Sequence, residues 1–430
     1  MYRILIVDSH SSANRGDAAI LQSLIDSLRQ QIPDATFKVH STYPHIATAM
    51  HYVAASHPLI RRPHGAIAYG LTLGKIALFF LLACGHRYGV DMIRYLPRHR
   101  LLAIYRDFLE ADLIVGMGGG FYNDNYRHSL PGRLFHLLLG KILRKPVVIS
   151  AHSIGPFRYP LYRWLAHFTF RQLDLICLRD EESLAHLDFC YLDRSRVKVV
   201  ADSAWLMKAS TPGRARQILA LENVPLGKSL VSVALIRWPF YKMKSVAEGH
   251  QHYLAAVAEV VSRLIKEFDC HVVFLSTNTS LGGHPTDDRR TAQEVQALLE
   301  PSLLAQTTRI GGEYLPQEIK ALYGEMTLHI GTRMHSVILA AAMETPVVGI
   351  AYEFKMVGVM RALGLAAYVT DIETIQASDF WLKVEAAWDK KEAITESIAE
   401  SLTVLKSLAM ENARLIAAVA CTFAQEDKNG

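Results

Sequence analysis

Three side chains in the second half of the sequence, Arg333, His335 and Lys355, could together bind an anion. Guanidinium and imidazole groups donate directional hydrogen bonds to carboxylates and phosphates, and the lysine ammonium adds a compact positive charge. A lone arginine or histidine usually forms a surface ion pair or supports the fold, so the clustering of three favours a site. The expected ligand is a small substrate with several negative charges.

The elements around these residues would place them at one edge of a sheet. Residues 326–330 (MTLHI) predict a buried strand, 336–343 (SVILAAAM) a buried helix and 346–352 (PVVGIAY) the next strand. Arg333 and His335 then lie where a strand turns into a helix. In an open α/β sheet ligands bind at the carboxyl ends of strands, and a helix N-terminus favours an anion.

The same alternation of strand-like and helix-like segments recurs along the chain and predicts an α/β protein with parallel sheets. A stretch with prolines and glycines, residues 207–228, reads as a domain boundary. We therefore expect one Rossmann-like domain over 1–206, a second over 229–378, and C-terminal helices over 379–424. Both domains carry polar or glycine-rich loops at strand ends, which predicts that the two face each other across a cleft.

The bulk composition excludes several classes of protein. Hydrophobic residues make up 50% of the 430 residues and charged residues 20%, which indicates a globular protein. A net charge of +5 without a dense basic block makes nucleic acid a poor candidate partner. Five scattered cysteines without a Cys-x-x-Cys pair predict neither disulfides nor zinc, and favour a cytoplasmic setting.

One apolar run, residues 66–84, is nearly long enough to cross a bilayer. Lys75 near its middle argues against a free span, and Arg62 and Arg87 flank it. We expect a buried helix of the first domain. The alternatives are a helix docked on the inner face of the membrane, which would make the chain a peripheral membrane protein, and a transmembrane helix.

Three sequence signatures of nucleotide or metal binding are absent or incomplete in the chain. The glycines at 116–120 follow a predicted strand, but a dinucleotide fingerprint needs a glycine where Phe121 stands. The chain contains neither an Asp-x-Asp motif nor a phosphate-binding P-loop. We expect no cofactor and no catalytic metal. Asn14–Leu21 (NRGDAAIL) predicts a helix start, at which Asp17 is either a simple N-cap or a site residue.

These segments together resemble the polysaccharide pyruvyl transferase family, and most closely its colanic-acid-type exopolysaccharide branch. The resemblance extends from Ile4 to Leu365 and is carried by NRGDAAIL, GGGFYND, HSIGPF, LRDEES and, above all, GTRMHSVILAAAMETPVVGIAYEFKMVGVMRALGL. It implies a GT-B-like pair of Rossmann domains. It also implies an enzyme that moves pyruvate from phosphoenolpyruvate onto a sugar as a ketal, with release of phosphate and without a metal.

The resemblance also implies roles for residues. Arg333 and His335 match the family's Arg-x-His pair on the donor side, in the second domain, with Lys355 and Arg237 as further contacts. The candidate catalytic residues are His335, as the general acid, with Arg333 and Asp17. The candidate bases are Asp17, Asp124 and His152. On the acceptor side, the first domain, the remaining candidate contacts are Asn14, Gly16, Gly119 and Ser153.

The acceptor implied by the resemblance is a saccharide, expected to be lipid-linked. The sequence does not identify the acceptor sugar. The main alternative is a metal-independent nucleotide-sugar glycosyltransferase of the same GT-B architecture, because a fold alone does not fix a function. A non-catalytic scaffold is a second alternative, against which the intact Arg237, Arg333, His335 and Lys355 argue.

Overall fold

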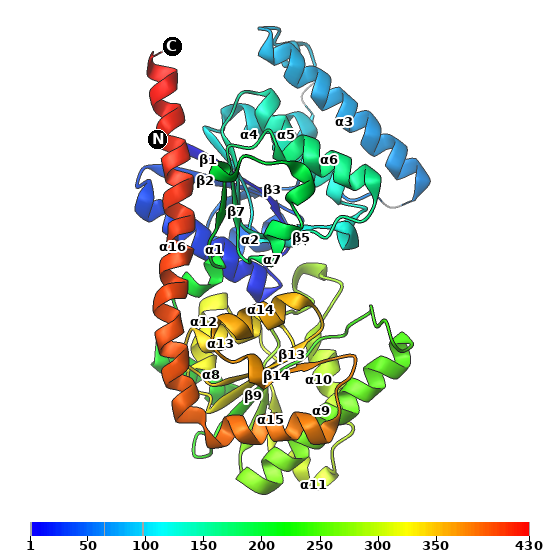
Figure 1. Ribbon diagram of the computed structural model, residues 1–430, viewed down its shortest axis with the longest axis vertical. Coiled ribbons are helices and arrows are strands. Elements are labelled where there is room, and N and C mark those ends of the chain that lie inside the picture. The colour runs from blue at the N-terminus through cyan, green and yellow to red at the C-terminus, as the bar shows by residue number, and fades with distance from the viewer. Residues whose placement is uncertain (1, 64, 97–98, 430) are drawn as a thin grey trace. The chain divides into compact units, whose positions relative to one another are not determined.

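Runs of aliphatic and β-branched residues form parallel strands that are buried on both faces. The computed structural model describes residues 2–63, 65–96 and 99–429. In the first strand, Ile4 to Val7 are each no more than 1% exposed. Parallel sheets need helices on both faces, and the connections between these strands supply them. Helices and strands alternate along the chain (Figure 1). The expected α/β class is confirmed.

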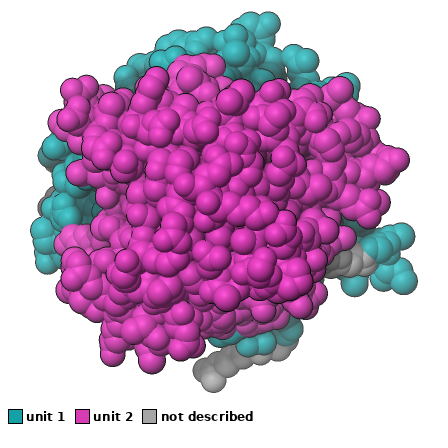
Figure 2. All heavy atoms as spheres, turned by 90° about the horizontal axis from the view of Figure 1, so that it is seen from below, with its two compact units in different colours: residues 1–12, 20–206, 406–430 teal, residues 13–19, 207–405 magenta. Residues whose placement is uncertain are grey.

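The chain divides into two compact units, which Figure 2 shows in different colours. Unit 1 comprises residues 1–12, 20–206 and 406–430, and unit 2 comprises residues 13–19 and 207–405. Two assignments differ from the expected domains. Residues 13–19 group with unit 2, and the C-terminal helices form no part of their own, because the chain passes from unit 2 to unit 1 at residue 406.

The sheet of unit 1 has strand order β3-β2-β1-β4-β6-β7-β8, with β5 paired to β6, and its strand pairs are parallel. Its strands are β1 (Tyr2–Ser9), β2 (Ala35–Ser41), β3 (Ala54–Ser56), β4 (Leu113–Gly116), β5 (Gly119–Tyr122), β6 (Val147–Ile154), β7 (Leu175–Leu178) and β8 (Val197–Val199).

The sheet of unit 2 has the order β11-β10-β9-β12-β13-β14 and is also parallel. Its strands are β9 (Leu230–Ala234), β10 (His271–Phe274), β11 (Thr307–Arg309), β12 (Leu328–Gly331), β13 (Val347–Ala351) and β14 (Val369–Asp371). This is the doubly wound order of dinucleotide-binding folds, in which the direction of winding reverses between β9 and β12. Ligands of such sheets bind outside the carboxyl ends at that reversal.

Helices cover both sheets (Figure 1). In unit 1 they are α2 (Pro44–His51), α3 (Ala66–Arg87), α4 (Arg100–Glu110), α5 (Leu130–Ile142), α6 (Pro160–Phe170) and α7 (Glu182–Ala185). In unit 2 they are α8 (Pro212–Leu221), α9 (Val246–Phe268), α10 (Asp288–Gln296), α11 (Pro301–Leu304), α12 (Pro316–Tyr323), α13 (Met334–Ala341), α14 (Phe354–Ala362) and α15 (Ala377–Asp389). Helix α1 (Arg15–Gln31) starts in unit 2 and α16 (Lys391–Asn429) ends in unit 1.

The last part of α16 belongs to the core of unit 1. Asn412 is fully buried, and its side-chain amide donates to the hydroxyl of Ser150 at 2.9 Å. Its Oδ1 accepts from the backbone N–H of Ala151 at 3.3 Å. A buried amide is stable only when its groups are paired, so these bonds fix the helix against β6.

Helix α3 differs from the expectation of a buried helix. Among the described residues it is the helix that is long and apolar enough to span a membrane by length and composition, yet only 17% of its most apolar window is buried. Phe79, Leu82 and Ala83 are its buried residues, and Ile67 is 83% exposed. The prediction of a core helix is therefore wrong, because composition does not reveal which faces of a helix find a partner.

Candidate functional site

The cationic residues of unit 2 lie on loops and helix starts that follow its strands. Arg333 and His335 follow β12, Arg237 follows β9, and Lys355 follows β13. The backbone N–H of Thr332 donates to the carbonyl of Ala234 at 2.8 Å, which joins the ends of β12 and β9. These residues therefore lie at the carboxyl edge of the sheet and next to its switch point, where an open α/β sheet binds ligands.

Arg333 is held by a buried carboxylate. Its Nε donates to Oδ2 of Asp288 at 2.9 Å and its Nη2 donates to Oδ1 at 2.7 Å. Asp288 is 2% exposed and opens α10. Burial opposes the charge on Arg333, but the attraction of Asp288, with smaller effects of Tyr352 and Asp17, raises its pKa. The guanidinium is thus a fixed positive charge whose orientation Asp288 sets.

The segment 13–19 packs beside His335 within unit 2. Asn14 forms an antiparallel bridge with Asn278, and the N–H of Arg15 donates to the carbonyl of Thr277 at 2.7 Å. A Cβ added to Gly16 would lie 2.4 Å from Nδ1 of His335. Only glycine allows this approach. Asn14 and Gly16, which we expected on the acceptor side in the first domain, therefore lie in unit 2, and Gly16 abuts His335.

The cap of α1 is Asn14 and not Asp17. Oδ1 of Asn14 accepts from the N–H of Gly16 at 3.0 Å, and the helix begins at Arg15. Asp17 lies within the first turn, where a carboxylate is favoured by the helix dipole. It is not an N-cap, which leaves the site interpretation of Asp17 open, and its charge acts on Arg333.

Arg15, which we did not single out from the sequence, anchors this segment. Its side chain is 1% exposed, and its Nη2 donates to Oε2 of Glu313 at 2.7 Å. Nε donates to the carbonyl of Tyr314 at 2.8 Å and Nη1 to that of Ala13 at 3.1 Å. Burial lowers the pKa of Arg15 and Glu313 opposes the shift. The arginine of the NRGD motif was the available signal, but its partner is far away in sequence.

A buried chain of side chains supports the turn that carries Arg333. The hydroxyl of Ser336 donates to the carbonyl of Arg333 at 2.7 Å and lies 2.9 Å from Nε2 of His329. Nδ1 of His329 lies 2.9 Å from Oγ of Ser232. Burial lowers the pKa of His329 to about 3, so the ring is neutral. A neutral ring that donates from Nε2 and accepts at Nδ1 satisfies all three groups.

Arg237 and Lys355 also face carboxylates. Arg237 is 66% exposed and its Nη1 lies 3.0 Å from Oε1 of Glu294, in α10. Nζ of Lys355 lies 3.4 Å from Oε2 of Glu353. Exposed ion pairs are weak, so Arg237 can exchange its partner for a ligand at little cost.

The other predicted residues belong to unit 1. His152 is fully buried, with its ring 4.5 Å from that of Phe121 and 4.3 Å from that of Tyr122. Its Nδ1 lies 2.7 Å from the carbonyl of Ser153. This burial favours a structural role for His152 over that of a base.

Of the remaining acceptor-side candidates, Ser153 and Asp124 accept hydrogen bonds from nearby residues and Gly119 lies in β5. The hydroxyl of Ser153 accepts from Nε of Arg179 at 2.7 Å and donates to Asp180. Asp124 accepts from the backbone N–H of Arg158. Gly119 has φ of +153°, a conformation that other residues rarely adopt.

A buried carboxylate at the end of β1 was not predicted. Asp8 has φ of +67° and is 2% exposed. Its Oδ2 accepts from the hydroxyl of Tyr122 at 2.9 Å, and its Oδ1 lies 2.8 Å from Nδ1 of His136. These bonds tie the carboxyl end of β1 to β5 and α5.

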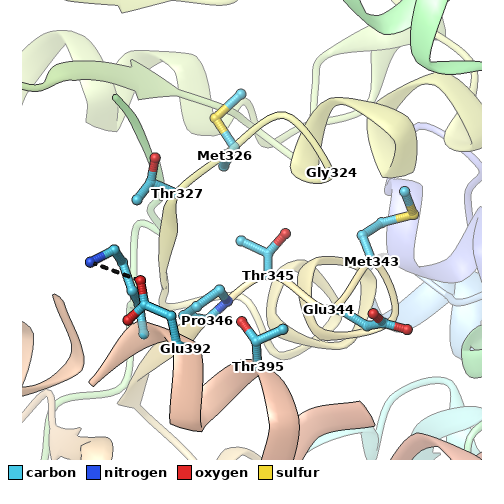
Figure 3. A pocket seen from close by; sticks show the side chains of 10 residues that line it. Gly324, Met326, Thr327, Met343, Glu344, Thr345, Pro346, Glu392 and Thr395 are labelled. Carbon is cyan, nitrogen blue, oxygen red and sulfur yellow. Dashed lines mark ion pairs between the residues drawn. The ribbon is translucent and has the colours of Figure 1, made fainter. Parts of the chain in front are cut away.

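A hollow of about 250 Å³ in unit 2 lies away from these residues. Figure 3 shows Thr327 and Pro346 on its wall, just before β12 and β13 begin, and Thr395 of α16 opposite. It therefore opens at the amino ends of the strands. Since ligands of open α/β sheets bind at the carboxyl ends, this hollow is not the candidate site.

Comparison with known proteins identifies the family. The family model for polysaccharide pyruvyl transferases matches residues 14–353, a span that starts at Asn14 and includes Arg237, Arg333 and His335. The chain belongs to this family. The enzyme is therefore a transferase of polysaccharide biosynthesis. It is 28% identical over 412 residues to the amylovoran biosynthesis protein AmsJ of Erwinia amylovora, covering 93% of this chain and 95% of that protein.

Solved structures confirm the GT-B-like fold. The transferase is similar to UDP-GlcNAc 2-epimerase from Neisseria meningitidis bound to UDP-GlcNAc, with a TM-score of 0.60, 13% identity and coverage of 98% and 100% of the two chains. A glycosyltransferase from Rickettsia africae ESF-5 matches with a TM-score of 0.57, 12% identity and coverage of 97% and 98%. At such identities the likeness concerns the fold alone.

Proposed function

We propose that this transferase moves the pyruvyl unit of phosphoenolpyruvate onto two hydroxyl groups of one sugar, in an exopolysaccharide or its lipid-linked repeat unit. Family membership and the amylovoran relative support a polysaccharide acceptor. The observation that carries the donor assignment is the cluster of Arg333, His335 and Gly16 at the switch point of unit 2.

The donor has a carboxylate and a phosphate, and the cluster offers groups for both. Arg333, oriented by Asp288, presents its guanidinium edge to one anionic group. Arg237, whose exposed pair with Glu294 is weak, and Lys355 contribute to the other. The first turn of α13 adds the positive end of its dipole.

The chemistry needs one proton at C3 of the donor and two new bonds at C2. In the proposed step His335 delivers the proton that converts the methylene into a methyl group, while a sugar hydroxyl adds to C2. The C2–O bond to phosphate then breaks and the second hydroxyl closes the ketal. Of the two hydroxyl protons, one replaces the proton spent at C3 and the other leaves with phosphate.

Asp17 is the favoured group for taking up a hydroxyl proton. It lies one residue after Gly16, which abuts His335, and its charge acts on Arg333. Its carboxylate is therefore on the same side of unit 2 as the donor groups. Asp124 and His152 belong to unit 1, and the burial of His152 argues against proton exchange with a substrate.

Ligand-induced stabilisation separates this proposal from a nucleotide-sugar glycosyltransferase. A ligand at one hundred times its Kd stabilises the folded state by about 2.7 kcal/mol. We expect phosphoenolpyruvate to raise the Tm of the wild type, and the Arg333→Ala variant to lose most of the rise. A rise with UDP-sugars and none with phosphoenolpyruvate would overturn the proposal. Mass spectrometry of polysaccharide from cells lacking the enzyme should show loss of a pyruvate ketal.

A further inference from the structure

Helix α3 exposes an apolar face that no described part of the chain covers. Its most apolar window has a mean hydropathy of 1.9. Leu71, Leu73 and Leu81 are 62%, 67% and 59% exposed. Its other face is fixed, since Phe79 is buried and stacks on Tyr105 at 5.4 Å between ring centroids. Several exposed leucines on one apolar helix are typical of an interaction site.

A second apolar group lies on α6. Leu161 and Trp164 are 60% and 61% exposed, and Trp164 stacks on the half-exposed Phe168 with centroids 5.9 Å apart. Helix α5 packs against both α3 and α6 (Figure 1). We call the exposed apolar residues of these two helices the α3–α6 surface.

Two contacts join the start of α3 to the start of α6. The hydroxyl of Tyr69 bonds to Nδ1 of His128. The preceding residue, Arg127, places its guanidinium 6.0 Å from the ring of Tyr159, which precedes α6. Tyrosines that combine an apolar ring with a polar tip are typical of the boundary between lipid and water.

The two stretches of sequence that carry this surface are mostly basic. Between residues 57 and 100 Asp91 is the sole carboxylate, and between 157 and 173 there is none. The basic residues of these two stretches include Arg61, Arg62, Lys75, Arg87, Arg94, Arg100, Arg158, Arg163 and Arg171. An apolar face with a basic rim suits an anionic lipid surface. A second copy of the chain would bring like charges together, which disfavours a symmetric dimer here.

We infer that the α3–α6 surface docks on an anionic bilayer, with α3 lying in the plane of the interface. Helix α3 does not cross the bilayer, because Phe79, Leu82 and Ala83 would have to leave the core of unit 1. Lys75 extends its ammonium to the headgroups while its stem stays in the apolar layer. This inference is independent of the group that the enzyme transfers.

The test is flotation of the purified full chain with vesicles of phosphatidylcholine alone or with phosphatidylglycerol added. We expect binding to the anionic vesicles, weakened by salt, and a blue shift of Trp164 emission that the Trp164→Phe variant lacks. Leu73→Glu combined with Leu81→Glu should weaken binding by about tenfold or more. Leu221→Glu in α8, where the leucine is 65% exposed, is the matched control.

Three results would overturn the inference. One is equal binding by the α3 double variant and the Leu221→Glu control. Another is the absence of any binding by a wild type whose circular dichroism shows it is folded. The third is a wild-type dimer in sedimentation velocity that the α3 substitutions split without any vesicle binding, which would assign the surface to a second copy. The Tm of each variant shows whether a loss reflects unfolding.

Discussion

Gly16 and His335 lie against each other although 319 positions separate them in the chain. A Cβ at residue 16 would stand 2.4 Å from Nδ1 and 2.5 Å from Cγ of the histidine ring. The glycine is therefore a spatial requirement of the site, and the position of the imidazole depends on a residue in the first turn of α1.

Replacing Gly16 by alanine should displace the His335 ring. A shift of about 1 Å in a catalytic group costs on the order of 10²-fold in rate, so we expect kcat to fall by about that factor. Gly213→Ala is the control, because Gly213 is likewise the second residue of a helix and a Cβ there meets nothing within 4 Å. Equal rates for the two variants would exclude a role of His335 in the chemistry.

Breaking the buried ion pair of Arg333 and Asp288 should cost more stability than breaking an exposed ion pair. Asp288→Asn removes the negative charge and leaves Arg333, whose side chain is 18% exposed, without its carboxylate. Breaking a buried pair costs about 3–5 kcal/mol, which urea denaturation would measure. Glu267→Gln, which breaks the exposed pair with Arg263, should cost about 0.3–0.5 kcal/mol. A similar loss of stability for the two variants would contradict the conclusion that burial makes the Arg333–Asp288 pair important.

The side chain of Arg15 should hold segment 13–19 in place and so keep Gly16 against His335. Arg15→Lys can replace only part of the fork that bonds Glu313, Tyr314 and Ala13. We expect a loss of about 1.5–3 kcal/mol in stability and faster hydrogen exchange at the N–H of Gly16. Arg216→Lys is the surface control, at 65% exposure. Unchanged exchange at Gly16 would show that the segment is held by other contacts.

Acid should weaken the protein through His329. Its folded pKa of about 3 lies below the usual unfolded value of about 6.5, so the unfolded chain binds more protons between these pH values. The stability it confers is complete above about pH 6.5 and is lost as the pH falls towards 3. The His329→Gln variant should have a flatter dependence of unfolding free energy on pH over this window. Parallel curves of unfolding free energy against pH for the wild type and His329→Gln would contradict the lowered pKa of His329.

The sequence was sufficient for the strand, turn and helix around Arg333, because two apolar runs separated by a short polar segment have few other interpretations. It also indicated two α/β units and the family. It did not reveal which residues pair with the predicted site residues. Asp288 stands in a polar stretch that reads as a loop, and its pairing with Arg333 depends on how α10 meets the turn after β12. Long-range contacts of this kind leave no periodic signal.

The absence of long-range information in the sequence also explains why the exposure of α3 and the hydrogen bonds of His329 were not predicted. A run such as 66–84 has the composition of a buried helix, and only the fold decides that its leucines find no partner. His329 looks like one more residue of an apolar strand, and its bonds to Ser232 and Ser336 come from two other elements.

Helix α10 supplies a carboxylate to each of the two arginines at the switch point, Asp288 to Arg333 and Glu294 to Arg237. The spacing of the two cations is therefore encoded in one short helix rather than in the loops that carry them. A chimera that exchanges α10 as a block with that of another family member should preserve donor geometry better than an exchange of either arginine loop. Recombination within the family would accordingly be tolerated at the ends of α10 and selected against inside it.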